Sequence, residues 1–404
     1  MRAFFFFCVL AAPALAAEAP AAIPASQPVP GDALIVNVLT FGPGSEAFFK
    51  FGHNGIWIHD PVAKTDNVYN FGTFGFDSPW LIVDFLKGRF SYWLSVEEIR
   101  GTIYGYRAED RSVSAQELDL SGPQKLALQQ ALDENAKPEN MKYKYDYYGD
   151  NCSTRVRDAI DRVSNGAIHA AANGPATLTF RQHTLRLTFG LLWEYIGLDI
   201  LMNDTIDKQT DVWHEMFLPS ILERTLRQAK LPNGAPLVKK ERVLVTSTRP
   251  PLRPQPPAWT VWFLLAGCIF GGVLMLLARA APRLHGLAVA LCGLVFGLIG
   301  SIFWLLWMFT DHMVAAHNEN IMQCAPWALL LVGCGVKLAL GRRSTWALPV
   351  ARSVAAFALL GLLCKALPFF DQDNWRIMAF LIPTWVALAF SLQRRSPLRA
   401  TALR

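Results

Sequence analysis

The chain has 404 residues, of which 52% are hydrophobic and 17% are charged, with a formal net charge of +6. This composition is apolar for a soluble protein, and long apolar runs lie between residues 257 and 393. The basic residues cluster beside those runs, so the net charge does not indicate a nucleic-acid partner, and we expect none. The length leaves room for one domain of ordinary size and a helical bundle.

Residues 1–16 have the features of an export signal. Arg2 supplies the positive start, Phe4 to Leu10 form an apolar stretch, and Ala14-Leu15-Ala16 is a small-x-small cleavage site. The alternative is an uncleaved anchor, although the stretch is short for a span, which requires about 20 apolar residues. The Ala- and Pro-rich residues 17–31 are expected to form a flexible tether.

Cys152 is the only cysteine in the segment 32–250. It follows the turn-forming sequence Gly149-Asp150-Asn151, and apolar residues then recur at helical spacing. The pattern predicts that Cys152 lies in the first turn of a helix, where unpaired N–H groups and the helix dipole stabilise a thiolate. The alternative is a buried and unreactive cysteine.

A nucleophilic thiol requires a base, and His53 is the best-placed histidine of the same segment. It lies in Gly52-His53-Asn54-Gly55, where apolar residues alternate as in a strand. A histidine held on a strand opposite a helix-borne thiol has the geometry that nucleophilic catalysis requires. No histidines and carboxylates have the spacing of a metal site, so we expect no metal and no cofactor.

These blocks resemble a known family, the Lnb-type lipoprotein N-acyltransferases, in their periplasmic domain. The matching segments are Gly52-His53-Asn54-Gly55-Ile56, Val68-Tyr69-Asn70-Phe71-Gly72 and Asp150-Asn151-Cys152-Ser153-Thr154-Arg155. Further matches are Asp211-Val212-Trp213, Phe217-Leu218-Pro219 and Thr310-Asp311-His312, followed by Asn318 and Asn320. The resemblance implies that Cys152 is an acyl-accepting nucleophile, that His53 is its base, and that the donor is a membrane lipid or an acylated protein.

The order of histidine before cysteine also resembles permuted NlpC-type papain-like folds, including lecithin:retinol acyltransferases. In those folds a third polar residue orients the histidine, and Asn70 is at the matching place; an ordinary strand-edge residue is the alternative. The oxyanion would be met by the Cys152 backbone N–H and one further donor, for which we choose Tyr148, with Asn151 as an auxiliary residue. Arg155 is a candidate for binding a lipid phosphate.

The C-terminal part is predicted to be a bundle of about five transmembrane helices, within 257–393, at 259–278, 286–308, 324–341, 350–367 and 377–393. The connecting loops alternate in charge. Arginines fall on one side, and the acidic residues Asp311, Glu319, Asp371 and Asp373 fall on the other. Because positive charge marks the cytoplasmic side, we expect the segment 32–250 in the periplasm, residues 394–404 in the cytoplasm, and the bundle in the inner membrane.

The loop 310–323 is expected on the periplasmic side, close to the exported domain. It carries His312, Asn318 and Asn320, which the family resemblance makes candidates for substrate binding. A solvated loop between two helices is the alternative.

We therefore expect an α+β, permuted papain-like periplasmic domain followed by the bundle, acting as a cysteine-dependent acyltransferase. The expected partners are diacylated lipoproteins and membrane phospholipid, with the N-terminal S-diacylglyceryl-cysteine as the favoured substrate. The alternatives are a cysteine amidase or peptidase that acts on cell-wall peptide, and a non-catalytic membrane binding protein.

Overall fold

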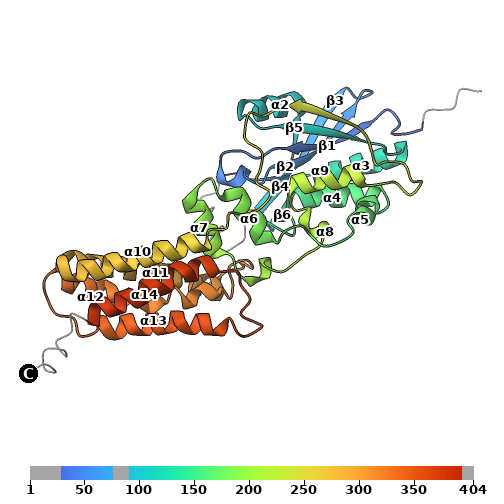
Figure 1. Cartoon of the computed structure of the whole chain (residues 1–404). Coiled ribbons are helices and arrows are strands. Elements are labelled where there is room, and N and C mark those ends of the chain that lie inside the picture. Colours follow the sequence, from blue (N-terminus) through green and yellow to red (C-terminus); the bar gives the residue numbers. More distant parts are fainter. Residues whose placement is uncertain (1–28, 76–90, 394–404) are drawn as a thin grey trace, which may run out of the picture.

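The computed structural model describes residues 29–75 and 91–393. The predicted export signal, most of the predicted tether and the predicted cytoplasmic tail lie outside these residues. A mixed sheet-and-helix part comes first along the chain, and an elongated bundle of helices follows it (Figure 1). The predicted α+β class is confirmed for the N-terminal part, whereas the permuted papain-like fold remains a prediction.

The N-terminal part is built on one sheet in which every pair of neighbouring strands is antiparallel. The strand order is β6-β4-β3-β2-β1-β5-β7. The strands are β1 (Ile35–Phe41), β2 (His53–Asp60), β3 (Thr65–Thr73), β4 (Ser91–Glu98), β5 (Val113–Leu118), β6 (Lys142–Lys144) and β7 (Val238–Val245).

Helices cover both faces of this sheet. One face carries α3 (Gly122–Asn135), α4 (Cys152–Val163), α5 (Ala167–Ala171) and α9 (Pro219–Gln228), and the other carries α2 (Ile99–Ala108) (Figure 1). The helices α6 (Phe180–Thr188) and α7 (Leu192–Leu201) and the turn η2 (Asp204–Ile206) lie on the side of the sheet that meets the bundle (Figure 1). The short helix α8 (Val212–Glu215) follows and packs beside α4 and α5. A short turn, η1 (Ala47–Phe49), precedes β2.

The alternation of residues along β2 decides which face each side chain meets. Ile56 and Ile58 pack against Val156 and Ile160 of α4, and all four are at most 1% exposed. Burial of each such side chain stabilises the fold by about 1.5–3 kcal/mol. Trp57 faces the opposite side, where it packs with the residues beneath α2. The predicted strand at His53 and the predicted helix at Cys152 are both confirmed.

Four helices of the C-terminal part are long and apolar enough to cross a membrane. They are α10 (Thr260–Ala280), α11 (Pro282–Phe309), α13 (Ala347–Cys364) and α14 (Trp375–Gln393). The predicted third span, 324–341, instead forms the turn η4 (Pro326–Leu329) and the ten-residue helix α12 (Leu330–Ala339). This pair is shorter than the roughly 20 residues that a span requires.

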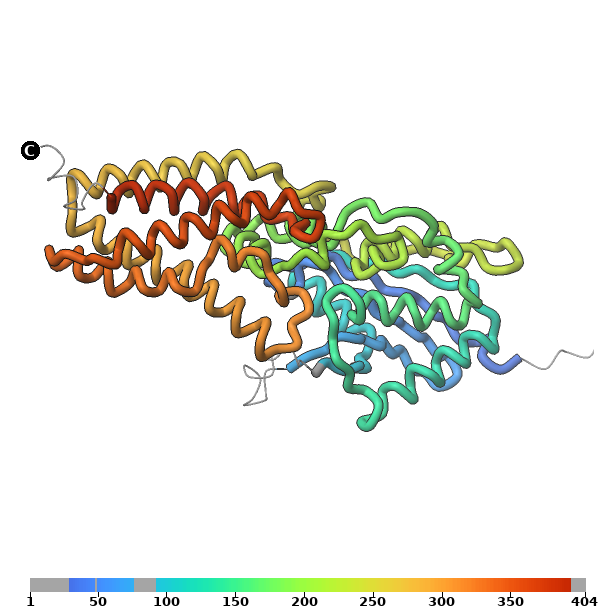
Figure 2. Tube along the Cα trace, turned by 90° about the horizontal axis from the view of Figure 1, so that it is seen from below, coloured from blue at the N-terminus to red at the C-terminus, as the bar shows by residue number. Residues whose placement is uncertain are grey.

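The connections α11–α12 and α13–α14 lie at the end of the bundle that faces the sheet (Figure 2). These connections carry the acidic residues Glu319 and Asp373. Glu319 pairs with Lys365 and accepts the N–H of Gln372 in the other connection, and the N–H of Asp373 donates to Asp207 of the N-terminal part. Arg283 and Arg342 flank the connections at the opposite end. The two ends of the bundle therefore differ in charge in the way that the loop pattern predicts.

Close packing of α11 on the segment 324–339 depends on small residues. A methyl group added at Gly300 would lie 1.6 Å from the carbonyl oxygen of Cys324, and one at Gly286 would lie 2.3 Å from the amide nitrogen of Ala339. In a membrane, where lipid tails are as apolar as side chains, such close contact is a main source of attraction between helices.

Replacing Gly300 by Ala should therefore destabilise the bundle. Overpacking of this kind typically lowers the free energy of unfolding by about 1–3 kcal/mol. The melting temperature of the full chain in detergent micelles measures the effect. Gly333→Ala in α12 is the matched control, because no atom lies within 4 Å of the added methyl group. Equal melting temperatures for the two variants would contradict this account of the packing.

Candidate active site

His53 is the first residue of β2, and its ring is held by a neighbouring strand. The distance between its Nε2 and the Oδ1 of Asn70, on β3, is 3.2 Å. Since an amide oxygen only accepts hydrogen bonds, this contact places the ring proton on Nε2 and leaves Nδ1 as the basic nitrogen. The ring also stacks on Phe41, with centroids 5.5 Å apart. The structure thus brings two predicted site residues, His53 and Asn70, together.

Cys152 is the first residue of α4, and its helix begins where the prediction places it. The side chain of Asn151 caps the helix, because its Oδ1 accepts the N–H groups of Ser153 at 2.9 Å and Thr154 at 3.0 Å. The Asn151 amide group also donates to the carbonyl oxygens of Tyr147 and Phe217. Asn151 therefore fixes the position of the thiol and does not itself point at a substrate.

The thiol lies where the sheet opens. Pairing of β2 with β3 runs from Asp60–Thr65 to Ile56–Tyr69 and stops before His53. The backbone N–H of Asn54, the residue after His53, hydrogen-bonds to the Cys152 sulfur instead of to a strand. On the β3 side the chain turns at Gly72, which has φ +87°, and an added methyl group there would lie 3.4 Å from Cys152 Cβ.

His53 and Cys152 lie beside this opening, on opposite faces of the sheet. His53 shares its face with Phe41 and α2, whereas Cys152 comes from α4 on the other face. Burial raises the pKa of Tyr106, on α2, and the negative charge of a Cys152 thiolate adds to that rise. In the opening between β2 and β3 the sulfur contacts Asn54, the residue after His53, whereas no hydrogen bond joins the thiol to the imidazole among the described residues.

Both groups are neutral at rest. Burial lowers the pKa of His53 to about 4, although the hydrogen bond with Asn70 acts in the opposite direction. Burial also raises the pKa of the Cys152 thiol, while the N–H groups of Asn54 and Ser153 and the Tyr145 hydroxyl favour the thiolate. At neutral pH the pair is thus thiol and imidazole. The sequence predicts that the helix terminus stabilises a thiolate. In the resting protein the effect of burial on the thiol pKa is larger, and the thiol stays neutral.

The rings of Tyr92, Tyr143 and Tyr145 form a tyrosine wall beside the thiol, and its member Tyr145 contacts the sulfur, whereas the sequence indicated Tyr148. The hydroxyl of Tyr145 hydrogen-bonds to the Cys152 sulfur, and its ring stacks on Tyr92 at 4.0 Å. The hydroxyl of Tyr148 instead lies 2.9 Å from Thr184 Oγ1, and its ring stacks on Phe180. Alternation from the short strand β6 (Lys142–Lys144) could have indicated Tyr145, since Tyr143 and Tyr145 share a face.

Arg155 lies near the site, but its charge is already paired. Its guanidinium donates to both carboxylate oxygens of Asp150, at 2.6 and 2.8 Å, and lies 3.5 Å from the centroid of the Tyr143 ring. The side chain therefore ties α4 to the strand that carries the tyrosine wall. A lipid phosphate would have to displace Asp150 to bind there.

Two candidate residues of the loop 310–323, Asn318 and Asn320, contact α7. The side chain of Asn318 donates to the carbonyl oxygens of Ile200 and Leu201, and that of Asn320 donates to Ile200. Both residues are at most 4% exposed. The two asparagines dock the membrane bundle onto the end of α7, and the N–H of His312 points to Thr310 in the same loop.

A buried charge network completes this interface. Asp199, in α7, accepts hydrogen bonds from Arg181 of α6 at 3.1 Å and from Arg376 of α14 at 2.7 and 3.0 Å. Arg181 and Asp199 are fully buried. Arg181 also donates to Asp207 and to three backbone carbonyl oxygens. Sequence reasoning missed this network, although an arginine at the start of an apolar span is a signal that could have drawn attention to Arg376.

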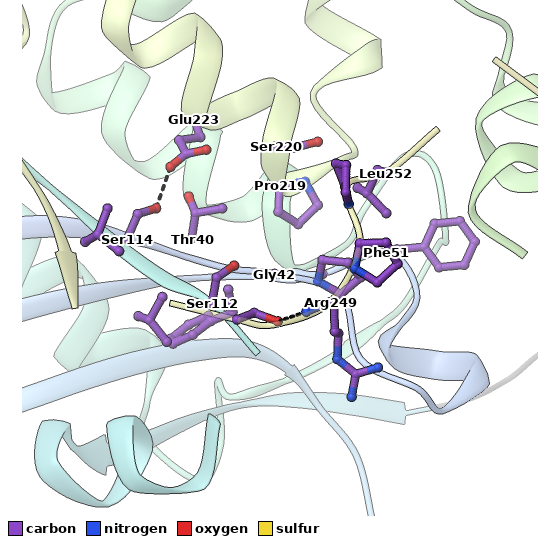
Figure 3. A pocket seen from close by; sticks show the side chains of 18 residues that line it. Thr40, Gly42, Phe51, Ser112, Ser114, Pro219, Ser220, Glu223, Arg249 and Leu252 are labelled. Atoms are coloured by element: carbon purple, nitrogen blue, oxygen red, sulfur yellow. Dashed lines mark hydrogen bonds between the residues drawn. The ribbon is translucent and has the colours of Figure 1, made fainter. Parts of the chain in front are cut away.

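A groove of about 400 Å³ opens beside Gly52, the residue before His53, between β1, α9 and the linker to the bundle (Figure 3). It is lined by Gly52 of the β2 approach, Pro219 and Glu223 of α9, and Arg249 and Leu252 of the linker to the bundle. Cys152 does not line it. A substrate in this groove would contact Gly52, the residue before His53 in the sequence.

Comparisons with known proteins agree with the motifs. Residues 28–187 match the family described as the Lnb N-terminal periplasmic domain. No curated protein and no solved structure matches the chain. The matched range contains the His53, Asn70 and Cys152 blocks. Together with the apolar helices, the match identifies a membrane protein with a periplasmic domain.

The neutral resting pair predicts how Cys152 reacts with iodoacetamide. Only the thiolate reacts, and its fraction should rise about tenfold per pH unit up to pH 9 or above, because the thiol pKa is raised. Peptide mass spectrometry of the alkylated full chain reports Cys152 separately from the other cysteines. A rate that is constant between pH 5 and 8 would reveal a thiolate–imidazolium pair and contradict the assignment.

Asp199→Asn should strongly destabilise the chain, because it leaves the two guanidinium groups of Arg181 and Arg376 without their shared buried carboxylate. Breaking a buried pair of this kind typically costs about 3–5 kcal/mol. Thermal unfolding in detergent measures the loss. Glu134→Gln is the control, since its pair with Lys137 is more than half exposed and should contribute at most about 1 kcal/mol. A melting temperature equal to that of the control would contradict a stabilising role.

Proposed function

Because residues 28–187 belong to the family of Lnb N-terminal periplasmic domains, we propose that this membrane protein is a thiol-dependent acyltransferase. It transfers a fatty acyl chain through Cys152 to the N-terminal amine of S-diacylglyceryl-cysteine in lipoproteins. The observation that carries the proposal is the opening between β2 and β3. There the Cys152 sulfur accepts the N–H of Asn54, next to a histidine whose Nε2 is held by Asn70.

In the first step the Cys152 sulfur attacks the carbonyl carbon of an ester-linked acyl chain. His53 Nδ1 takes the thiol proton as the carbon–sulfur bond forms. The carbon–oxygen bond then breaks, and His53 returns the proton to the departing alcohol of the lipid. The products are an acyl-thioester on Cys152 and a lipid with one chain fewer.

In the second step the amine of the acceptor attacks the thioester carbonyl. A carbon–nitrogen bond forms, the carbon–sulfur bond breaks, and the amine proton passes through His53 to the Cys152 thiolate. The enzyme returns to its neutral resting state. In both steps the negative oxygen is met by the backbone N–H of Cys152 and by the Tyr145 hydroxyl, which replaces Tyr148 in this role.

The two substrates differ in where they approach. The donor ester belongs to a lipid of the outer leaflet of the inner membrane, and diacylated lipoproteins are anchored in the same leaflet. We assign the acceptor peptide to the groove beside Gly52, because its lining includes the residue before His53 and residues 249–252 of the linker that precedes the bundle. The difference in charge between the two ends of the bundle supports a multi-pass orientation with the sheet in the periplasm.

The papain-like arrangement is part of the proposal. A cysteine at the start of a helix, a histidine on a strand packed against it, and an asparagine on the next strand occur in the same roles in permuted papain-like enzymes. The contact of His53 Nε2 with Asn70 Oδ1 supports this reading, since it selects the tautomer that accepts a proton at Nδ1.

The test is mass spectrometry of lipoprotein N-terminal peptides from cells that lack an endogenous N-acyltransferase. Cells that express this chain should show an added N-acyl group, and cells that express Cys152→Ala should not. Cys364→Ala, in α13, is the matched control and should keep the activity. Unchanged lipoproteins despite a well-expressed, inserted protein would overturn the proposal and favour the cell-wall amidase alternative.

Substitution of the histidine should separate catalysis from folding. His53→Gln should lower the rate by at least about 10²-fold, because general base catalysis contributes about 10²–10⁴-fold. His59→Gln is the control on the same strand, where His59 pairs with Asp66 at 2.8 Å and is partly exposed. The rate of N-acylation in membranes measures both. Equal rates for the two variants would remove His53 from the mechanism.

A further inference from the structure

Helix α7 (Leu192–Leu201) has its polar and apolar residues on the wrong sides for a helix in water. Glu194 and Asp199 are 5% and 0% exposed, whereas Leu192 and Trp193 are 56% and 70% exposed. The residue before the helix, Leu191, is also exposed. A water-soluble surface helix places charged residues outward and apolar residues inward. This inverted pattern is typical of an element that faces lipid.

The contacts of α7 place it at the membrane boundary. The ring of Tyr195 lies 4.8 Å from that of Trp259, the residue that precedes α10, and Ile200 packs against the core of the bundle. The first turn of α10 exposes Val261 and Trp262, each by more than 60%, at the point where that span begins. The exposed side of α7 is therefore continuous with a surface that meets lipid.

A cation flanks this apolar surface. The guanidinium of Arg253, in the linker to α10, lies 4.4 Å from the centroid of the Phe189 ring, just before α7. Arg253 forms no ion pair within the described ranges 29–75 and 91–393. Apolar side chains beside a free guanidinium suit the boundary between acyl chains and phosphate groups, where in-plane helices lie.

We propose that α7 lies in the plane of the outer leaflet of the membrane that the bundle spans, with Leu192 and Trp193 inserted among the lipids. The helix is thus a monotopic element that precedes the first span. It also bears on the site, because Met202, at its end, contacts Tyr148, four residues before Cys152. The inference concerns membrane contact alone and does not depend on the acyltransferase proposal.

The test is quenching of a bimane fluorophore on one introduced cysteine in the full chain, reconstituted in phosphatidylcholine nanodiscs. The background has the substitutions Cys152→Ala, Cys268→Ser and Cys364→Ser, leaves the buried Cys292, Cys324 and Cys334 in place, and carries bimane at Trp193→Cys. Brominated phospholipids should quench the probe. Aqueous iodide should quench it at least about threefold less than it quenches a probe at Tyr104→Cys. Tyr104 is 76% exposed on α2, on the far face of the sheet.

Two further positions calibrate the result. A probe at Trp262→Cys, on the exposed surface of α10, reports full contact with lipid. A probe at Leu192→Cys should behave like the one at 193, and it decides the question if the first variant does not fold. If both α7 probes are quenched by iodide as strongly as the probe at 104 and are unaffected by brominated lipid, the inference is wrong.

Discussion

The attachment of the N-terminal part to the bundle depends on a buried carboxylate, that of Asp199. Asp199 is fully buried, and it binds one guanidinium from the periplasmic part, Arg181, and one from the bundle, Arg376. A buried charge is costly unless its partners keep good geometry, so the network tolerates little relative movement of the two parts. Asn318 and Asn320 add hydrogen bonds to the same end of α7. The N-terminal part is therefore held in a fixed position relative to the bundle.

A chain of polar contacts leads from this interface to the thiol. Tyr148 bonds to Thr184 of α6, the helix that also carries Arg181. In the same helix His183 bonds to Glu215 at 2.8 Å, and the next two residues, Met216 and Phe217, accept hydrogen bonds from Ser153 and Asn151 at the start of α4. The cap that positions Cys152 is thus anchored, through α6 and α8, to the elements that meet the bundle. The acyltransferase site proposed above would gain from such a connection, because misplacement of a nucleophile by about 1 Å can cost about 10²-fold in rate.

Local patterns in the sequence predicted the parts of the site that lie on regular elements. The helix at Cys152 follows from a capping residue and an apolar face, the strand at His53 follows from alternation, and both are observed. Tyr145, the Asp199 network and the docking roles of Asn318 and Asn320 could not be predicted, because each depends on residues that are between 7 and about 180 positions apart and meet only in the fold. The third span was overestimated because hydropathy does not register the turn at Pro326. The exposed face of α7 was missed for a related reason, since apolar residues are expected inside until the neighbouring element is known.

The proposed function rests on a covalent acyl-thioester at Cys152. Intact mass spectrometry of the purified full chain, after incubation with phospholipid nanodiscs and no acceptor, detects this intermediate. We predict an added mass of one fatty acyl chain that neutral hydroxylamine removes and that Cys152→Ala abolishes. A chain that stays unmodified, or an adduct that survives in the Cys152→Ala variant, would contradict the account.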